Sequence, residues 1–212
     1  MKIQRNKLLR LAASSAAGLA MAQAVSAATI LTGQAGANNA GIDSNHGSNA
    51  VGTPNVTLTW DNGGVWEVYN DWDAEAGNLV YQVDGDGAGT VTHQIVLTPD
   101  AGWNVILSSF DVDDWAGGGG DSSLDWDVTG SVSGSIDSGT YTQPDGTKSA
   151  LAFNVTGSNN ETLTLSITQT GGFSSYLAMD NLSFDQVAVP EPSSALLGAI
   201  GLGAMAMRRR RK

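Results

Sequence analysis

The stretch Thr162-Leu163-Thr164-Leu165-Ser166-Ile167-Thr168 alternates hydroxyl side chains with branched aliphatic ones. Successive side chains of a β-strand point to opposite faces of its sheet, so Leu163, Leu165 and Ile167 face one way and the hydroxyls face the other. The stretch therefore predicts a strand with one buried face and one solvated face.

Similar strands are expected throughout residues 28–188, because shorter runs such as Val56–Trp60 show the same alternation. Turn sequences such as Asn62-Gly63-Gly64 and Pro144-Asp145-Gly146 separate the runs, and no helical period of useful length occurs between them. About ten short strands with regular turns predict an all-β fold, a single antiparallel sandwich of the jelly-roll type. The expected strands are 55–60, 65–70, 78–83, 91–98, 104–112, 125–132, 135–142, 149–156, 161–169 and 176–186, with a shorter one near 29–31.

The N-terminus has the composition of a secretory signal peptide. Four basic residues among the first ten precede an Ala-rich apolar stretch at 11–25, and Val25-Ser26-Ala27 supplies the small residues that a signal peptidase needs. We expect a signal helix over residues 1–27, cleaved after Ala27, and hence export through the inner membrane. The alternative, a permanent N-terminal membrane helix, is disfavoured because the stretch is short and rich in Ala and Ser.

Residues 189–212 combine three features in a set order. An apolar, uncharged stretch at 193–207 would form a helix of about 22 Å, shorter than the roughly 30 Å hydrocarbon core of a bilayer. Flanking cations can reach lipid headgroups and extend such a span, and they place that end in the cytoplasm, so we expect a transient transmembrane helix. The flanking residues are Val189, Pro190, Glu191 and Pro192 on one side and Arg208, Arg209, Arg210, Arg211 and Lys212 on the other.

This order of Val-Pro-Glu-Pro, apolar span and terminal Arg cluster resembles the PEP-CTERM sorting signal of Gram-negative, biofilm-forming bacteria. The resemblance implies that an exosortase processes the chain near Pro190-Glu191-Pro192. It also implies a location in the cell envelope or extracellular matrix and an association with extracellular polysaccharide. An ordinary single-span tail anchor is the alternative, and it would leave the Pro-Glu-Pro without a role.

The part of the chain between these two signals is strongly acidic. Residues 28–188 hold Lys148 as their only Lys or Arg against 20 Asp and Glu, a net charge near −19 compared with −11 for the whole chain. Such a surface disfavours nucleic acid and anionic membranes and is compatible with cations, neutral glycans or metal-bridged anionic polymers. Solubility of an exported protein is the simpler explanation. The absence of cysteine excludes disulfides, thiol chemistry and thiolate metal sites.

Two clusters of residues suggest ligands. Residues 176–184, which make up most of the last expected strand, resemble the closing strand of galactose-binding-like jelly rolls. In those proteins an Asp at the place of Asp180 can ligate a structural calcium. We expect calcium, if bound, at Asp180 and at Asp111, Asp113 and Asp114, since hard cations prefer carboxylate oxygens. Alternating Asp residues can instead form the solvated side of a strand.

Sugar rings stack on exposed aromatic side chains, and Trp72 and Trp115 lie in expected acidic loops, where binding residues tend to occur. Packing in the core is the alternative for any of the six Trp. Only His46 and His93 are present, and neither a Gly-x-Ser-x-Gly nor a His-Glu-x-x-His motif occurs, so we expect no catalytic residues. The sequence thus predicts a non-catalytic, polysaccharide-associated envelope or matrix protein. A secreted polysaccharide hydrolase or lyase and a self-assembling surface coat remain as alternatives.

Overall fold

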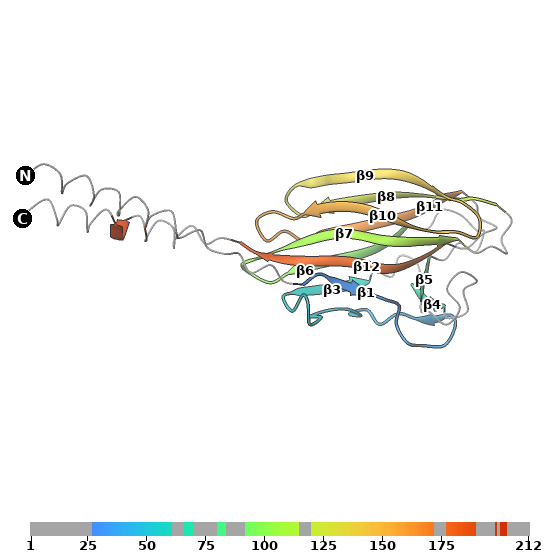
Figure 1. The fold of residues 1–212 in the computed structure, drawn as a ribbon, viewed down its shortest axis with the longest axis horizontal. Helices are drawn as coiled ribbons and strands as arrows, with labels where there is room; N and C mark the ends of the chain where they lie inside the picture. The colour runs from blue at the N-terminus through green and yellow to red at the C-terminus, as the bar shows by residue number, and fades with distance from the viewer. Residues whose placement is uncertain are drawn as a thin grey trace, which may run out of the picture.

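The computed structural model describes residues 27–60, 66–69, 92–114, 120–171, 177–189, 198 and 200–202, and the backbone of 80–83. Within these ranges the chain forms two antiparallel sheets packed face to face (Figure 1). The strands are β1 Thr29–Leu31, β2 Ala40–Gly41, β3 Val56–Trp60, β4 Glu67–Tyr69, β5 Val80–Val83, β6 Thr92–Pro99, β7 Trp103–Asp114, β8 Ser122–Gly130, β9 Gly134–Gln143, β10 Lys148–Thr156, β11 Leu163–Gly171 and β12 Leu177–Ala188.

One sheet has seven strands in the order β10-β7-β12-β5-β4-β2, with β1 also paired to β12, and the other has five in the order β3-β6-β11-β8-β9. From β6 onward the chain crosses repeatedly between the sheets, as it does in jelly-roll sandwiches. The predicted all-β sandwich is confirmed. Each expected strand is present, with ends displaced by at most three residues, and only the two-residue β2 was not predicted.

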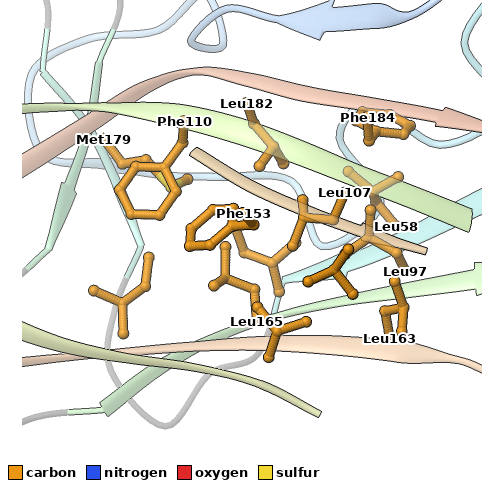
Figure 2. Close-up of a cluster of buried hydrophobic side chains, with 14 of the residues drawn as sticks. Leu58, Leu97, Leu107, Phe110, Phe153, Leu163, Leu165, Met179, Leu182 and Phe184 are labelled. Atoms are coloured by element: carbon orange, nitrogen blue, oxygen red, sulfur yellow. The ribbon is translucent and has the colours of Figure 1, made fainter. Parts of the chain in front are cut away.

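The core lies between the two sheets and follows the predicted alternation. Leu163, Leu165 and Ile167 of β11 are buried, whereas the intervening Thr164 and Ser166 are partly exposed on the outer face. Burial of a side chain of this size stabilises the fold by about 1.5–3 kcal/mol. Figure 2 shows the centre of this core, which is formed by Leu58, Leu97, Leu107, Phe110, Phe153, Leu163, Leu165, Met179, Leu182 and Phe184.

The sandwich has a tail end and a far end. At the tail end, Ala188 closes β12 opposite Trp103, and the Val189 N–H donates to the Gly102 carbonyl at 2.8 Å. At the far end β7 finishes and β10 begins, because β7 runs antiparallel to its neighbours β10 and β12. Strand β8 of the other sheet also begins at this end (Figure 1). The C-terminal tail therefore begins at the end of the sandwich that lies opposite the end of β7 and the start of β8.

The predicted signal helix and C-terminal helix fall almost entirely outside the described residues. Helical backbone is present at Gly198 and at 200–202. None of the helical residues that the structure describes belongs to a helix with the length and hydrophobicity to cross a bilayer.

Candidate functional site

Strand alternation divides the predicted calcium residues between two places. Asp111 and Asp113 of β7 lie on the outer side of the seven-stranded sheet, together with Asp180 of β12. Asp114, one residue further along, points to the opposite side, where Ser122 is its neighbour. The four Asp residues therefore do not converge on one point, and among the described residues no three Asp, Glu or His side chains could hold one metal ion. Calcium binding stays a prediction.

A lysine lies between two of these carboxylates. Asp111 and Asp180 are register partners across β7 and β12, and Lys148 at the start of β10 reaches both. Its Nζ atom lies 3.2 Å from Asp180 Oδ2 and 3.6 Å from Asp111 Oδ2. The Asn181 side chain also donates to Asp111 Oδ2 at 2.8 Å. The only cation of residues 28–188 is thus paired with two of the four carboxylates that were predicted to bind calcium.

Asp114 belongs to a separate group at the far end of the sandwich. Burial raises the pKa of its carboxyl to about 6, and Asp145 and Asp121 add to the rise through charge repulsion, while the nearby Ser122 hydroxyl and N–H act to lower it. The Ser122 contact falls short of hydrogen-bond geometry, so both Asp114 oxygens are buried without a hydrogen bond from any described residue. A buried, unpaired carboxylate is costly, which makes this group unusual.

Glu161 is a buried carboxylate that was not predicted from the sequence. It is buried and accepts the Ser158 N–H at 2.7 Å and the Ser133 N–H at 2.9 Å, together with the hydroxyls of both serines. Burial alone would raise its pKa, but these hydrogen bonds outweigh burial and lower it to about 2. Its side chain therefore joins the β8–β9 turn to the β10–β11 turn as a structural link. A Cβ at Gly130 would collide with this carboxylate, so a larger residue there would displace the Glu161 side chain.

The outer side of the five-stranded sheet is a nearly unbroken polar surface, which we call the hydroxyl face. Register places Gln94, Ser166, Asp127 and Ser138 in one row across four strands, with further hydroxyls and Asp125 in the next row. Neighbours bond along the rows, as Thr140 does to Asp125 at 2.7 Å. The face comprises Thr57, Thr59, Thr92, Gln94, Thr98, Ser123, Asp125, Asp127, Thr129, Ser135, Ser138, Thr140, Thr142, Thr164, Ser166 and Thr168, with Val96 as the apolar member.

The predicted sugar-stacking residues Trp72 and Trp115 lie outside the described residues. Other tryptophans follow the core alternative. Trp60 and Trp66 are buried and pack edge to face with their ring centroids 5.1 Å apart, and Trp66 makes a similar contact with buried His93. Trp126 packs on Phe153 at 4.9 Å. These three rings stabilise the interior.

Comparison with known proteins identifies the C-terminal segment. Residues 188–212 match the PEP-CTERM protein-sorting motif, which includes the predicted Val189, Pro190, Glu191, Pro192 and the four terminal arginines. This motif marks an exported, envelope-associated protein whose processing partner is an exosortase. Of the motif residues named, Val189 is the one that the structure describes. The match covers the tail and not the sandwich. No curated protein matches the chain.

Several solved structures resemble the sandwich at low identity. An arabinose-bound MgGH51 α-L-arabinofuranosidase is 10% identical with a TM-score of 0.42, over 76% of this chain and 27% of that chain. TmCBM61 in complex with β-1,4-galactotriose is 8% identical with a TM-score of 0.36, over 63% and 88%. The family 11 carbohydrate-binding module of Lic26A-Cel5E of Clostridium thermocellum is 13% identical with a TM-score of 0.32, over 80% and 99%. This chain thus spans about a quarter of the arabinofuranosidase, and these likenesses say nothing about its own ligands.

Proposed function

We propose that this exported, exosortase-sorted protein is a non-catalytic component of the envelope or extracellular matrix that associates with extracellular polysaccharide. The observation that carries the proposal is the hydroxyl face. Its rows of hydroxyl, amide and carboxylate groups follow neighbouring strands about 4.8 Å apart and cross most of the five-stranded sheet. A polysaccharide presents hydroxyl groups at regular intervals along its chain, and these can donate to and accept from such rows.

Charge supports a glycan rather than other polymers. The hydroxyl face contains Asp125 and Asp127 but no Lys or Arg, in a body whose net charge is near −19. Phosphate-rich polymers would be repelled from this surface. A neutral polysaccharide would bind directly, whereas an anionic one would need a divalent cation between the two surfaces.

The hydroxyl face also explains why such binding would be weak at each single site. Many of its groups already bond to each other, for example Thr92 to Thr168 at 2.7 Å and Gln94 to Ser166 at 3.0 Å. Exchange of these bonds for bonds to sugar gains little for each group, since the net contribution of one hydrogen bond is about 1 kcal/mol. Association with a long polymer would then depend on many weak contacts made by many protein copies.

The test is co-sedimentation of residues 28–188 with the extracellular polysaccharide of the producing cell, first with calcium and then with a chelator. The described members of the hydrophobic core and the described side chains packed against it lie between Leu31 and Phe184, so this segment retains the core that the structure describes. The double variant Gln94→Ala/Ser166→Ala should reduce the bound fraction several-fold. Thr156→Val, which removes an exposed hydroxyl from β10 on the other sheet, should leave binding unchanged.

Three outcomes would oppose the proposal in different ways. Absence of binding in both conditions would exclude polysaccharide association and favour the surface-coat alternative, which predicts self-assembly without glycan. Release of sugar fragments during the incubation would favour a hydrolase or lyase. Equal loss of binding in the hydroxyl-face variant and in Thr156→Val would show that the face is not the binding surface.

A further inference from the structure

Five polar residues meet at the far end of the sandwich, where three strand ends come together. Asp114 is the last residue of β7, Asp121 and Ser122 stand at the start of β8, and Gln143 ends β9 just before Asp145. The Asp114 N–H donates to the Thr147 carbonyl at 3.2 Å, and Gln143 Nε2 donates to the same carbonyl at 2.7 Å.

The remaining members of the group are held by β8. Ser122 is the register partner of Gln143 across β8 and β9. The Asp145 N–H donates to Asp121 Oδ1 at 3.1 Å, which draws the turn before β10 against the start of β8. Because these contacts connect all three segments, the side chains of the group lie within one small region.

Four oxygen atoms of this group are buried and accept no hydrogen bond from any described residue. They are both carboxylate oxygens of Asp114, the hydroxyl oxygen of Ser122 and Oε1 of Gln143. The orientation of the Gln143 amide is fixed by its contacts, because only its nitrogen can donate to the Thr147 carbonyl. Native structures leave few such groups without a partner, so four in one place require an explanation.

No basic side chain is available to neutralise this group. Lys148 is the only Lys or Arg in residues 28–188, and its ammonium group is paired with Asp111 and Asp180 on the outer side of the seven-stranded sheet. Asp121 and Asp145 add further negative charge around Asp114. No described basic side chain satisfies these oxygens, and a cation or a proton from solution would do so.

We propose that the far end of the sandwich binds a hard divalent cation of the calcium type, ligated by the Asp114 carboxylate, Ser122 Oγ and Gln143 Oε1. Oxygen-only ligands without His or Cys suit calcium and disfavour zinc or copper. With one buried carboxylate in the first sphere, water completes the coordination, and Asp121 and Asp145 attract the ion through their charge. The site differs in position from the pair Asp111 and Asp180, which binds Lys148, and it does not depend on polysaccharide.

A site with one carboxylate ligand should be weak, comparable to extracellular calcium modules with dissociation constants of about 10⁻⁴–10⁻³ M. Occupation would hold the β9–β10 turn against the ends of β7 and β8. The bound ion should therefore stabilise the fold as well as give a binding signal.

The experiment measures calcium binding and thermal unfolding on the full chain in a mild non-ionic detergent at pH 7.5. Calorimetric titration with CaCl₂ should give saturable binding in the range of about 10⁻⁴–10⁻³ M, and the unfolding temperature should be higher in saturating calcium than in EDTA. Asp114→Asn should weaken binding at least tenfold and abolish the calcium-dependent rise in unfolding temperature. Asp111→Asn is the matched control, because it removes a carboxylate from the same strand without touching the site, and it should keep the full calcium response.

A second variant distinguishes loss of the calcium site from a general folding defect. Gln143→Glu adds a carboxylate to the site, so it should lower the unfolding temperature in EDTA and bind calcium more tightly than the unmodified chain. The proposal is overturned if the unmodified chain shows neither heat nor a temperature shift at millimolar calcium. It is also overturned if Asp111→Asn removes the response and Asp114→Asn keeps it.

Discussion

The ammonium group of Lys148 lies 3.2 Å from the carboxylate of Asp180, although 32 residues separate the two in the chain. The side chain of Asp180 is almost fully buried and that of Lys148 is about one-fifth exposed. The pair therefore links the two long strands β10 and β12 across β7 in a protein with a large excess of negative charge.

Replacement of Lys148 by Met should destabilise the fold by about 3 kcal/mol at pH 7, because it leaves a buried carboxylate without its partner. Urea denaturation followed by tryptophan fluorescence measures the change. The double variant Lys148→Met/Asp180→Asn should regain most of the lost stability, since the remaining amide carries no charge. An unchanged midpoint for Lys148→Met would show that the ion pair does not contribute.

Glu161 should make stability depend on pH in the acid range. Its pKa is about 2 in the folded protein and 4.5 as the ordinary value, so its contribution is fully present above pH 4.5 and is lost as the pH falls towards 2. Glu161→Gln should lower the free energy of unfolding by about 2 kcal/mol at pH 7 and much less at pH 2.5. Denaturation at the two pH values measures the difference, and an equal loss at both would assign the effect to packing rather than to charge.

Asp114 should have the opposite effect on pH dependence. Because its folded pKa of about 6 lies above the ordinary 3.8, its stabilising protonated form is fully populated below pH 3.8 and is lost as the pH rises through 6. In EDTA, Asp114→Asn should raise the free energy of unfolding by about 2 kcal/mol at pH 8 and leave it almost unchanged at pH 3.5. Thermal unfolding across this range provides the measurement. A variant that is less stable than the unmodified chain at pH 8 would contradict the assignment.

The alternation in β11 predicts a large difference between adjacent positions. Leu165 is fully buried in the central strand of the five-stranded sheet, so Leu165→Ala should cost about 3 kcal/mol through lost burial and the cavity that remains. Thr164→Ala, one residue earlier on the outer face, should change stability by less than about 0.5 kcal/mol. Chemical denaturation of both variants tests the register of this strand, because a shift by one residue would reverse the two effects.

The strands were predictable because each has one buried and one solvated face, and this alternation is present in the local sequence. Stretch 162–168 shows this most clearly, and the structure confirms the inward direction of its three aliphatic residues. The two-residue β2 was missed because Ala40–Gly41 carries no alternating pattern that could indicate a strand. The resemblance of the tail was recognisable because all three of its parts are contiguous in the chain.

The candidate sites were less predictable, because they depend on which strands are neighbours. Nothing near Lys148 in the sequence indicates Asp180 as its partner, since the contact depends on the register of β10, β7 and β12. Glu161 acquires its local hydrogen bonds from Ser158, but the others come from Ser133, in a turn 28 residues earlier in the chain. Strand alternation could have separated Asp114 from Asp113, but the boundary of β7 was predicted at residue 112, two residues before its observed end.

The position of β12 has a mechanical consequence for a protein handled by its C-terminus. The strand that continues into the sorting segment is central in the seven-stranded sheet and pairs with β7 from Leu177 to Ala188, while β1 pairs with it on the other side. A pulling force applied through the tail acts along β12, so the hydrogen bonds to its neighbours bear the load together and in shear. An edge strand pulled across its length would instead detach one bond at a time. A C-terminal strand in this position is therefore suited to transmit tension from the tail to the folded body.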